Sequence, residues 1–134
     1  GVSSYYTIRY GNKIYHPYDG YTSSLSSSGF KYFDSSNIER DSYLDDDGIG
    51  NVRIYYISNG IRTYINNSAG TVDYETGVVK INNIKINSSI GNSFVRIMVE
   101  PREKDVDSIT NTILLIDSSD VDSLSITMNS VNVV

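Results

Sequence analysis

Short runs of alternating apolar and polar residues recur along the chain, and clusters of turn residues separate them. In the clearest run, Val95, Ile97 and Val99 alternate with Arg96 and a methionine. Because successive side chains of a strand point to opposite faces, this period of two residues predicts a strand with one buried face. No window of a dozen residues shows a helical period. The pattern therefore favours β-structure throughout.

Segments rich in β-branched and aromatic residues, each bounded by Gly, Asn, Asp or Ser, predict the other strands. The predicted strands cover residues 5–10, 31–33, 52–57, 61–65, 71–74, 78–86, 95–99, 111–116 and 124–128. Turns that each contain a glycine are predicted at 58–60, 66–70 and 75–77. The run at 111–116 is a candidate for a strand buried on both faces.

The remaining segments complete the predicted fold. Residues 12–30 contain Pro17, an Asp-Gly pair and a serine-rich section, and they predict an ordered loop. Pro101 ends the strand at 95–99 or lies at an edge, and residues 102–108 predict a loop or a single helical turn. The predicted fold class is all-β: an antiparallel sandwich or meander-type sheet with long N-terminal loops and little or no helix.

Composition narrows the function classes. The chain has 134 residues, the size of one ordinary domain, and its 39% apolar and 20% charged residues are not those of a disordered chain. Its longest apolar runs are four or five residues, whereas a membrane-spanning helix needs about 20. The net charge of −5 and the scattered basic residues argue against nucleic-acid binding. Cysteine is absent, which removes disulfides, thiolate metal sites and cysteine nucleophiles.

Three consecutive aspartates at 45–47, followed by two glycines, raise the question of a calcium loop. An EF-hand loop needs oxygen ligands at alternate positions, Gly at the sixth and Glu at the twelfth. In the better of two frames Ile49 and Tyr56 occupy ligand positions, so the motif fails. An irregular site on Asp45 and Asp47 is the alternative. Because Asp and Gly are typical of tight turns, we interpret the segment as a corner whose charges also discourage edge-to-edge strand pairing.

The sequence contains no strong candidate for a catalytic or phosphate-binding site. His16 is the only histidine, and it precedes Pro17 in a loop without the nucleophile and orienting partner that a catalytic base needs, so we interpret it as structural. Most acidic residues lie in predicted turns and single out no catalytic pair. The Gly-x-Gly at 48–50 precedes a strand and lacks a third glycine, so it is not a phosphate loop. The sequence predicts no enzyme, and no catalytic, cofactor-binding or metal-binding residue.

The chain contains 12 tyrosines, many of them in its first third. Tyrosine combines a large apolar body with a polar tip and is common at protein interfaces. It also suits the rim of a small β core, and a tyrosine-lined groove can stack on sugar rings. The candidate interface residues are Tyr15, Tyr18, Tyr21, Tyr55, Tyr64 and Tyr74.

Four segments in a fixed order carry a resemblance: YHPYDGYTSSLSSSGF, YLDDDGIGNVRIYYI, AGTVDYETGVVKI and IMVEPREKDVDSITNTILLID. Together they resemble the C-terminal part of the baseplate wedge proteins of T4-like phages, especially marine ones, in the large subunit that forms the inner baseplate ring around the tail tube. The resemblance covers roughly residues 5–117. Its most specific pieces are Gly70 to Gly77 and Asp47 to Tyr55. The chain departs from the pattern at 110–112, where Thr-Asn-Thr replaces Arg-Asn-Gln.

The resemblance implies that residues 1–134 form a single β domain from the C-terminal part of a larger virion protein, with 118–134 as a peripheral strand or tail. The absence of an initiator Met also leads us to expect a fragment. The implied function is structural, in the baseplate of a contractile phage tail assembled in the host cytoplasm. The implied partners are the protein itself, as a dimer or ring contact, and other baseplate wedge proteins, with no nucleic acid and no membrane. The alternative is a carbohydrate- or calcium-binding β-sandwich module.

Overall fold

The computed structural model describes residues 5–17, 23–82, 84–91, 93–102, 109–115 and 124–127. Within these residues there is no helix, and so no helix that could cross a membrane. The strands are β1 (Tyr5–Arg9), β2 (Leu25–Ser27), β3 (Phe30–Phe33), β4 (Glu39–Asp46), β5 (Asn51–Ser58), β6 (Ile61–Asp73), β7 (Val78–Asn82), β8 (Ser88–Ser89), β9 (Phe94–Val99), β10 (Ile109–Leu115) and β11 (Leu124–Thr127).

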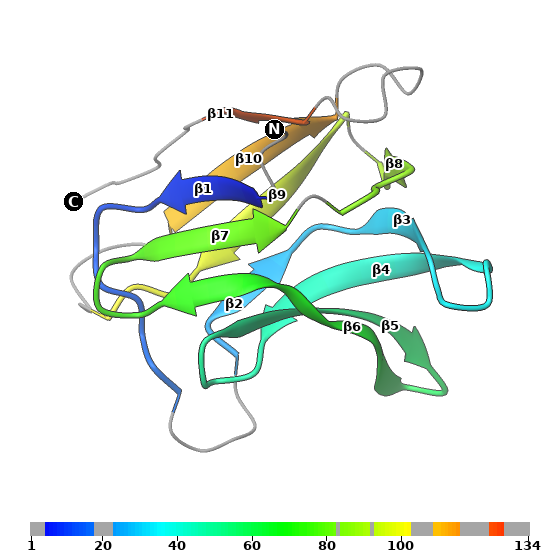
Figure 1. The fold of residues 1–134 in the computed structure, drawn as a ribbon, viewed down its shortest axis with the longest axis horizontal. Helices are drawn as coiled ribbons and strands as arrows, with labels where there is room; N and C mark the ends of the chain where they lie inside the picture. The colour runs from blue at the N-terminus through cyan, green and yellow to red at the C-terminus, as the bar shows by residue number, and fades with distance from the viewer. Residues whose placement is uncertain are drawn as a thin grey trace.

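The strands form one large antiparallel sheet. Nine of them follow the order β1-β7-β6-β5-β4-β2-β9-β10-β11, and β3 pairs with β4 and β8 outside this path. Figure 1 shows the sheet curling into a half-barrel. Strands β4 to β7 are neighbours in the sequence as well as in space, so this part is a meander. The predicted all-β antiparallel class is confirmed, and the sheet is of the meander type rather than a sandwich.

The core lies on the inner face of the curled sheet. The alternation of side chains along each strand explains which residues form the core. Val95, Ile97 and Val99 of β9 are all buried, as are Val52 and Ile54 of β5. Burying an aliphatic side chain of this size contributes about 1.5–3 kcal/mol each. The buried apolar residues are Ile8, Tyr10, Ile14, Leu25, Phe30, Leu44, Val52, Ile54, Ala69, Val72, Tyr74, Val79, Ile81, Ile84, Val95, Ile97 and Val99.

The segment after β1 closes one end of the half-barrel. The Tyr10 hydroxyl donates to the carbonyl of Ile97 at 3.1 Å, and Ile14 pairs with Pro101 in an isolated bridge just beyond β9. The backbone N–H of Ile14 also donates to the Tyr74 carbonyl at 2.8 Å. This segment therefore connects the end of β6 to the end of β9 at that end of the half-barrel.

Strand β6 corrects the prediction of two short strands separated by a turn at 66–70. The strand runs unbroken from Ile61 to Asp73, and its register against β5 shifts where the turn was expected. The Asn66 side chain accepts the Ser68 N–H at 2.8 Å, so a side chain satisfies the backbone of the extra residues. The turn-forming residues were recognised correctly, but they form a β-bulge inside a longer strand instead of a corner.

Strand β4 was not predicted. Its sequence, ERDSYLDD, is too polar to suggest a strand, yet Ser42, Leu44, Asp45 and Asp46 are all buried. The first two aspartates of the predicted corner therefore lie inside the sheet. Our interpretation of their charges as protection for an exposed edge is wrong for Asp45 and Asp46, because both carboxylates are inaccessible.

Smaller differences concern the ends of individual strands and the segments near the two termini. Strand β7 ends at Asn82 instead of residue 86, and the predicted N-terminal loop contains the short strand β2. The strand at 95–99 is confirmed and ends before Pro101. Strands β10 and β11 overlap the predicted strands at 111–116 and 124–128, and β11 is the last strand of the sheet. The prediction for 102–108 lies almost wholly outside the described residues.

Candidate functional site

The turn between β4 and β5 is held by Asp47. Its Oδ1 accepts the N–H groups of Ile49 and Asn51, both at 2.9 Å, and its Oδ2 accepts the Asn51 amide at 2.7 Å. Burial alone would raise the pKa of Asp47, but these hydrogen bonds outweigh it and lower the pKa. Gly48 and Gly50 have positive φ angles of 82° and 104°, which glycine adopts readily. The predicted corner is confirmed for the segment from Asp47 onward.

Asp46 joins three strands at this end of the half-barrel. Its Oδ1 accepts the backbone N–H groups of Ser24 at 2.7 Å and Leu25 at 2.9 Å, and its Oδ2 accepts the Tyr74 hydroxyl at 2.5 Å. The side chain is 1% exposed. A buried carboxylate needs such a complete set of donors, because an unpaired charge in the interior is costly. Asp46 therefore holds β4, the start of β2 and the end of β6 together.

Asp45 is buried on the opposite face of β4 under two arginines. Arg53 contacts both of its carboxylate oxygens, at 2.9 and 3.2 Å, and Arg62 donates to Oδ2 at 2.7 Å. The Tyr64 hydroxyl donates to the same oxygen at 2.7 Å. Burial raises the pKa of Tyr64, and the hydrogen bond to Asp45 raises it further. This cluster joins β4, β5 and β6 on the face turned away from the core.

These hydrogen bonds engage the carboxylate oxygens that a calcium site on the three aspartates would need as ligands. The carboxylate oxygens of Asp45, Asp46 and Asp47 each accept hydrogen bonds from the protein's own donors, and the first two side chains are inaccessible. In the described part of the chain no group of three or more His, Cys, Asp or Glu residues is arranged to hold a metal ion. The three aspartates act as structural acceptors in this arrangement.

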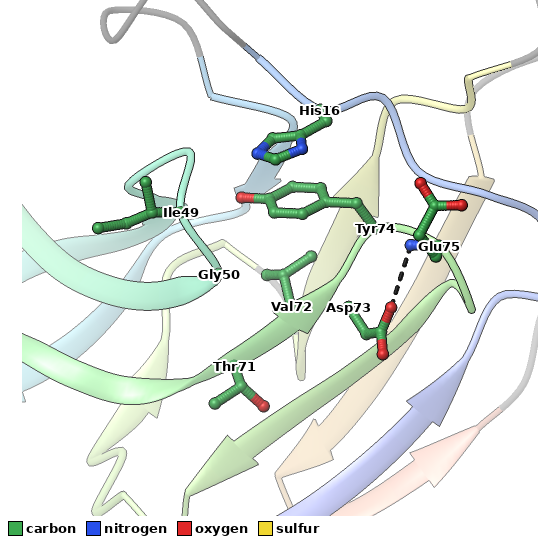
Figure 2. A pocket seen from close by; sticks show the side chains of 8 residues that line it. All are labelled: His16, Ile49, Gly50, Thr71, Val72, Asp73, Tyr74 and Glu75. Atoms are coloured by element: carbon green, nitrogen blue, oxygen red, sulfur yellow. Dashed lines mark hydrogen bonds between the residues drawn. The ribbon is translucent and has the colours of Figure 1, made fainter.

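A hollow of about 420 Å³ lies where the β4–β5 turn meets the end of β6 (Figure 2). His16 stacks on Tyr74 with ring centroids 4.2 Å apart and planes 6° from parallel, and its Nε2 donates to the Gly48 carbonyl at 2.7 Å. Burial, followed by the hydrogen bond to Asp46, raises the pKa of Tyr74 above its ordinary value. His16 thus fixes the turn against β6.

The acidic rim of this hollow is also held by the protein itself. The Arg102 guanidinium donates to Glu75 at 2.8 Å and lowers its pKa, with a smaller effect from Lys13. Asp73 accepts the backbone N–H groups of Glu75 at 3.0 Å and Thr76 at 3.1 Å, which lower its pKa. Segments from all four resembling stretches of sequence therefore meet at one end of the half-barrel, where internal contacts hold them together.

The four candidate interface tyrosines that the structure describes do not form one surface. Tyr55 and Tyr64 face each other across β5 and β6, half-buried, with ring centroids 5.6 Å apart. The Arg62 guanidinium covers Tyr55, and Arg53 covers Tyr64. Tyr74 is buried, and Tyr15 is exposed in the segment that closes the half-barrel. Tyr18 and Tyr21 lie outside the described residues.

Exposed apolar side chains gather instead on two adjacent hairpins, β3–β4 and β5–β6, which project at the same end of the molecule (Figure 1). We call this the hairpin-end surface, and its residues, between 46% and 68% exposed, are Phe33, Ile38, Ile57 and Ile61. Arg40 lies beside it, paired with Asp34 at 3.0 Å. An apolar centre with a charged rim is the usual anatomy of a protein interface.

Sequence reasoning missed the hairpin-end surface, although a signal for it was present. Ile57 is out of phase with the buried Val52 and Ile54 of the same strand, so strand alternation alone places it on the outer face. Ile61 directly follows the Asn59-Gly60 turn, where little of the sheet can cover it.

Comparison of the chain with protein-family models, curated proteins and solved structures finds no match.

Proposed function

We propose that this chain is a non-enzymatic structural domain of a contractile phage tail baseplate, and that it joins wedge subunits to one another. The proposal combines the order of the four resembling segments with the hairpin-end surface. Its partners are then a second copy of the chain and other baseplate wedge proteins, and its location is the virion. The proposal involves no cofactor.

The observation that carries the proposal is the exposure of Phe33, Ile38, Ile57 and Ile61 at one end of the sheet. Surface apolar residues scattered singly need no explanation, but four that are exposed on two neighbouring hairpins, at one end of the sheet, favour contact with a partner at that end. By contrast, the polar residues of the hollow and of the aspartate clusters are engaged in internal contacts. The surface that fits an assembly role is therefore the apolar one.

Co-expression tests the proposal. The tagged chain is produced together with the wedge subunits encoded in the same phage genome and recovered by its tag. We expect at least one of these subunits to be recovered with the chain. The variant Ile57→Lys places a charge on the hairpin-end surface and should reduce this recovery about tenfold or more.

Ile49→Lys is the matched control, because Ile49 is even more exposed but lies in the β4–β5 turn, at the opposite end of β5. It should leave recovery unchanged. A chain with which no wedge subunit is recovered would contradict the proposal. Unchanged recovery with Ile57→Lys would show that the contact lies elsewhere than the hairpin end.

A further inference from the structure

Strand β6 is paired on only one side along its first half. It pairs with β5 from Ile61 onward, whereas its contact with β7 covers only Gly70 to Asp73. In the described part of the chain no strand pairs with the other edge of residues 61–65. The β5–β6 hairpin thus presents an open sheet edge beside the hairpin-end surface.

The backbone groups that face this edge follow from the hairpin register. Asn59 and Gly60 both have positive φ, as in a two-residue type I′ turn, and Ser58 pairs with Ile61 across it. In such a hairpin the residues flanking the turn exchange hydrogen bonds, and the next residue along points its N–H and C=O outward. The outward pairs therefore belong to Arg62 and Tyr64.

This edge lacks the protection that edge strands usually carry. Proteins cover such edges with outward charges, proline or very short strands. The edge sequence IRTYI contains one charged residue, Arg62, and its guanidinium turns back over Tyr55 to donate to Asp45. The Tyr64 side chain turns to the same carboxylate. Asp45 holds both side chains over the face of the sheet, so they do not shield the edge.

The edge sequence is also complementary to itself. When two copies run antiparallel about Thr63, Arg62 lies opposite Tyr64 of the second copy, and Ile61 lies opposite Ile65 of the second copy. All outward N–H and C=O groups of Arg62 and Tyr64 are then paired, in four hydrogen bonds. In this register Ile faces Ile, Thr faces Thr and Arg faces Tyr, so no like charges are opposed. Such cross-strand pairs are favourable.

We infer that the open edge of β6 pairs with the same edge of a second copy of this chain, and that the two half-barrels then share one continuous sheet. The contact is isologous, with a two-fold axis at Thr63. The inference deepens the proposed function, on which its biological role rests, by naming the self-contact of the assembly. A register that opposes Arg62 with its own copy is disfavoured by charge repulsion.

Cross-linking tests the register directly. The chain contains no cysteine, so Thr63→Cys introduces the sole thiol. In the inferred register the two copies of residue 63 form a non-hydrogen-bonded pair with Cα atoms about 4.5 Å apart, which suits a disulfide. With diamide as the oxidant, we expect Thr63→Cys to form dimers at least about tenfold faster than Ile49→Cys, an exposed single thiol far from the axis.

A second pair of variants isolates the backbone. In the Thr63→Cys chain, Arg62→Pro removes an outward N–H, whereas Arg62→Ala removes the same side chain and keeps that donor. Proline should slow cross-linking about tenfold relative to alanine. Cross-linking of Thr63→Cys no faster than that of Ile49→Cys, or equal rates for proline and alanine, would overturn the inference.

The inference and the proposed function fail in different experiments. A chain that does not cross-link at residue 63 but is recovered with wedge subunits keeps the proposed function and overturns the β6 contact. The edge would then accept a strand from a different protein. Rapid cross-linking without any wedge subunit recovered supports the β6 contact and contradicts the role in the baseplate.

Discussion

The Tyr74 hydroxyl donates a 2.5 Å hydrogen bond to Oδ2 of Asp46, and both side chains are buried. This contact joins the residue just beyond β6 to the last residue of β4, 28 positions apart in sequence. His16 stacks on a face of the Tyr74 ring. Tyr74 therefore connects the segment that contains His16, the end of β4 and the end of β6 at the end of the half-barrel opposite the hairpin-end surface.

Replacing Tyr74 by phenylalanine keeps the ring and removes the donor. Asp46 Oδ2 is then buried without its partner, and we expect a loss of about 1–3 kcal/mol in the free energy of unfolding, measured by urea denaturation. Tyr55→Phe is the control, because Tyr55 is held by ring contacts, and its cost should be under about 0.5 kcal/mol. Equal costs would show that the Asp46 contact contributes nothing specific.

Stability should fall at alkaline pH, in part through Tyr74. Burial and the hydrogen bond to Asp46 raise the pKa of Tyr74 in the folded chain, whereas the unfolded tyrosine titrates near about 10. The stabilisation is therefore fully present below about pH 10 and is lost as the pH rises above it, because the unfolded state releases its proton first. Denaturation midpoints above pH 10 should fall more steeply for the wild type than for Tyr74→Phe. Parallel profiles would contradict this assignment.

Removing the Asp45 carboxylate should be costly. Asp45→Ala leaves Arg53, Arg62 and Tyr64 without their shared acceptor, and we expect a loss of about 2–4 kcal/mol, less than for a fully buried pair because the arginines reach solvent. Asp41→Ala removes an exposed carboxylate paired with Lys31 and should cost under about 1 kcal/mol. Thermal denaturation of both variants distinguishes the two cases. Similar melting temperatures would mean that the Asp45 cluster is not stabilising.

Gly70 permits the close approach of β6 and β7. A Cβ atom built at Gly70 would lie 2.0 Å from the carbonyl oxygen of Lys80, a backbone atom that cannot move aside. Gly70→Ala should therefore cost more than about 3 kcal/mol. Gly60→Ala meets no atom within 4 Å and pays only for its positive φ, about 1 kcal/mol. A Gly70→Ala chain as stable as Gly60→Ala would contradict this packing.

Calcium should leave the melting temperature unchanged at millimolar concentration. Ligands that bind only the folded state raise its stability, but the oxygens of Asp45, Asp46 and Asp47 are already occupied by internal donors. Magnesium at the same ionic strength controls for salt effects. A rise of several degrees that is specific to calcium would restore the metal-binding alternative.

Much of the fold could be predicted because alternation is visible where one face of a strand is apolar, as in Val95, Ile97 and Val99 of β9. Strand β4 escaped prediction since its buried residues include Asp45 and Asp46, whose partners come from distant strands and leave no local signal. The bulge in β6 was mistaken for a turn, because turn residues serve both structures.

The exposed residues of the candidate interface could likewise be predicted only where strand alternation reveals which side chains point outward. The hairpin-end residue Ile57 could have been found from its phase within β5, whereas the pairing of Phe33 with β4 depends on a strand that sequence patterns did not reveal. The tyrosines were chosen by residue type, and residue type does not distinguish the buried Tyr74 from the exposed Tyr15. Burial of individual tyrosines is set by tertiary contacts.

The measurement that tests the central claim most directly is quantitative mass spectrometry of virus particles purified from a culture that produces this chain. The account predicts peptides of the chain in intact particles and in isolated tails, at a constant ratio to the other baseplate wedge proteins. Peptides that are abundant in the infected-cell lysate but absent from purified tails would contradict it.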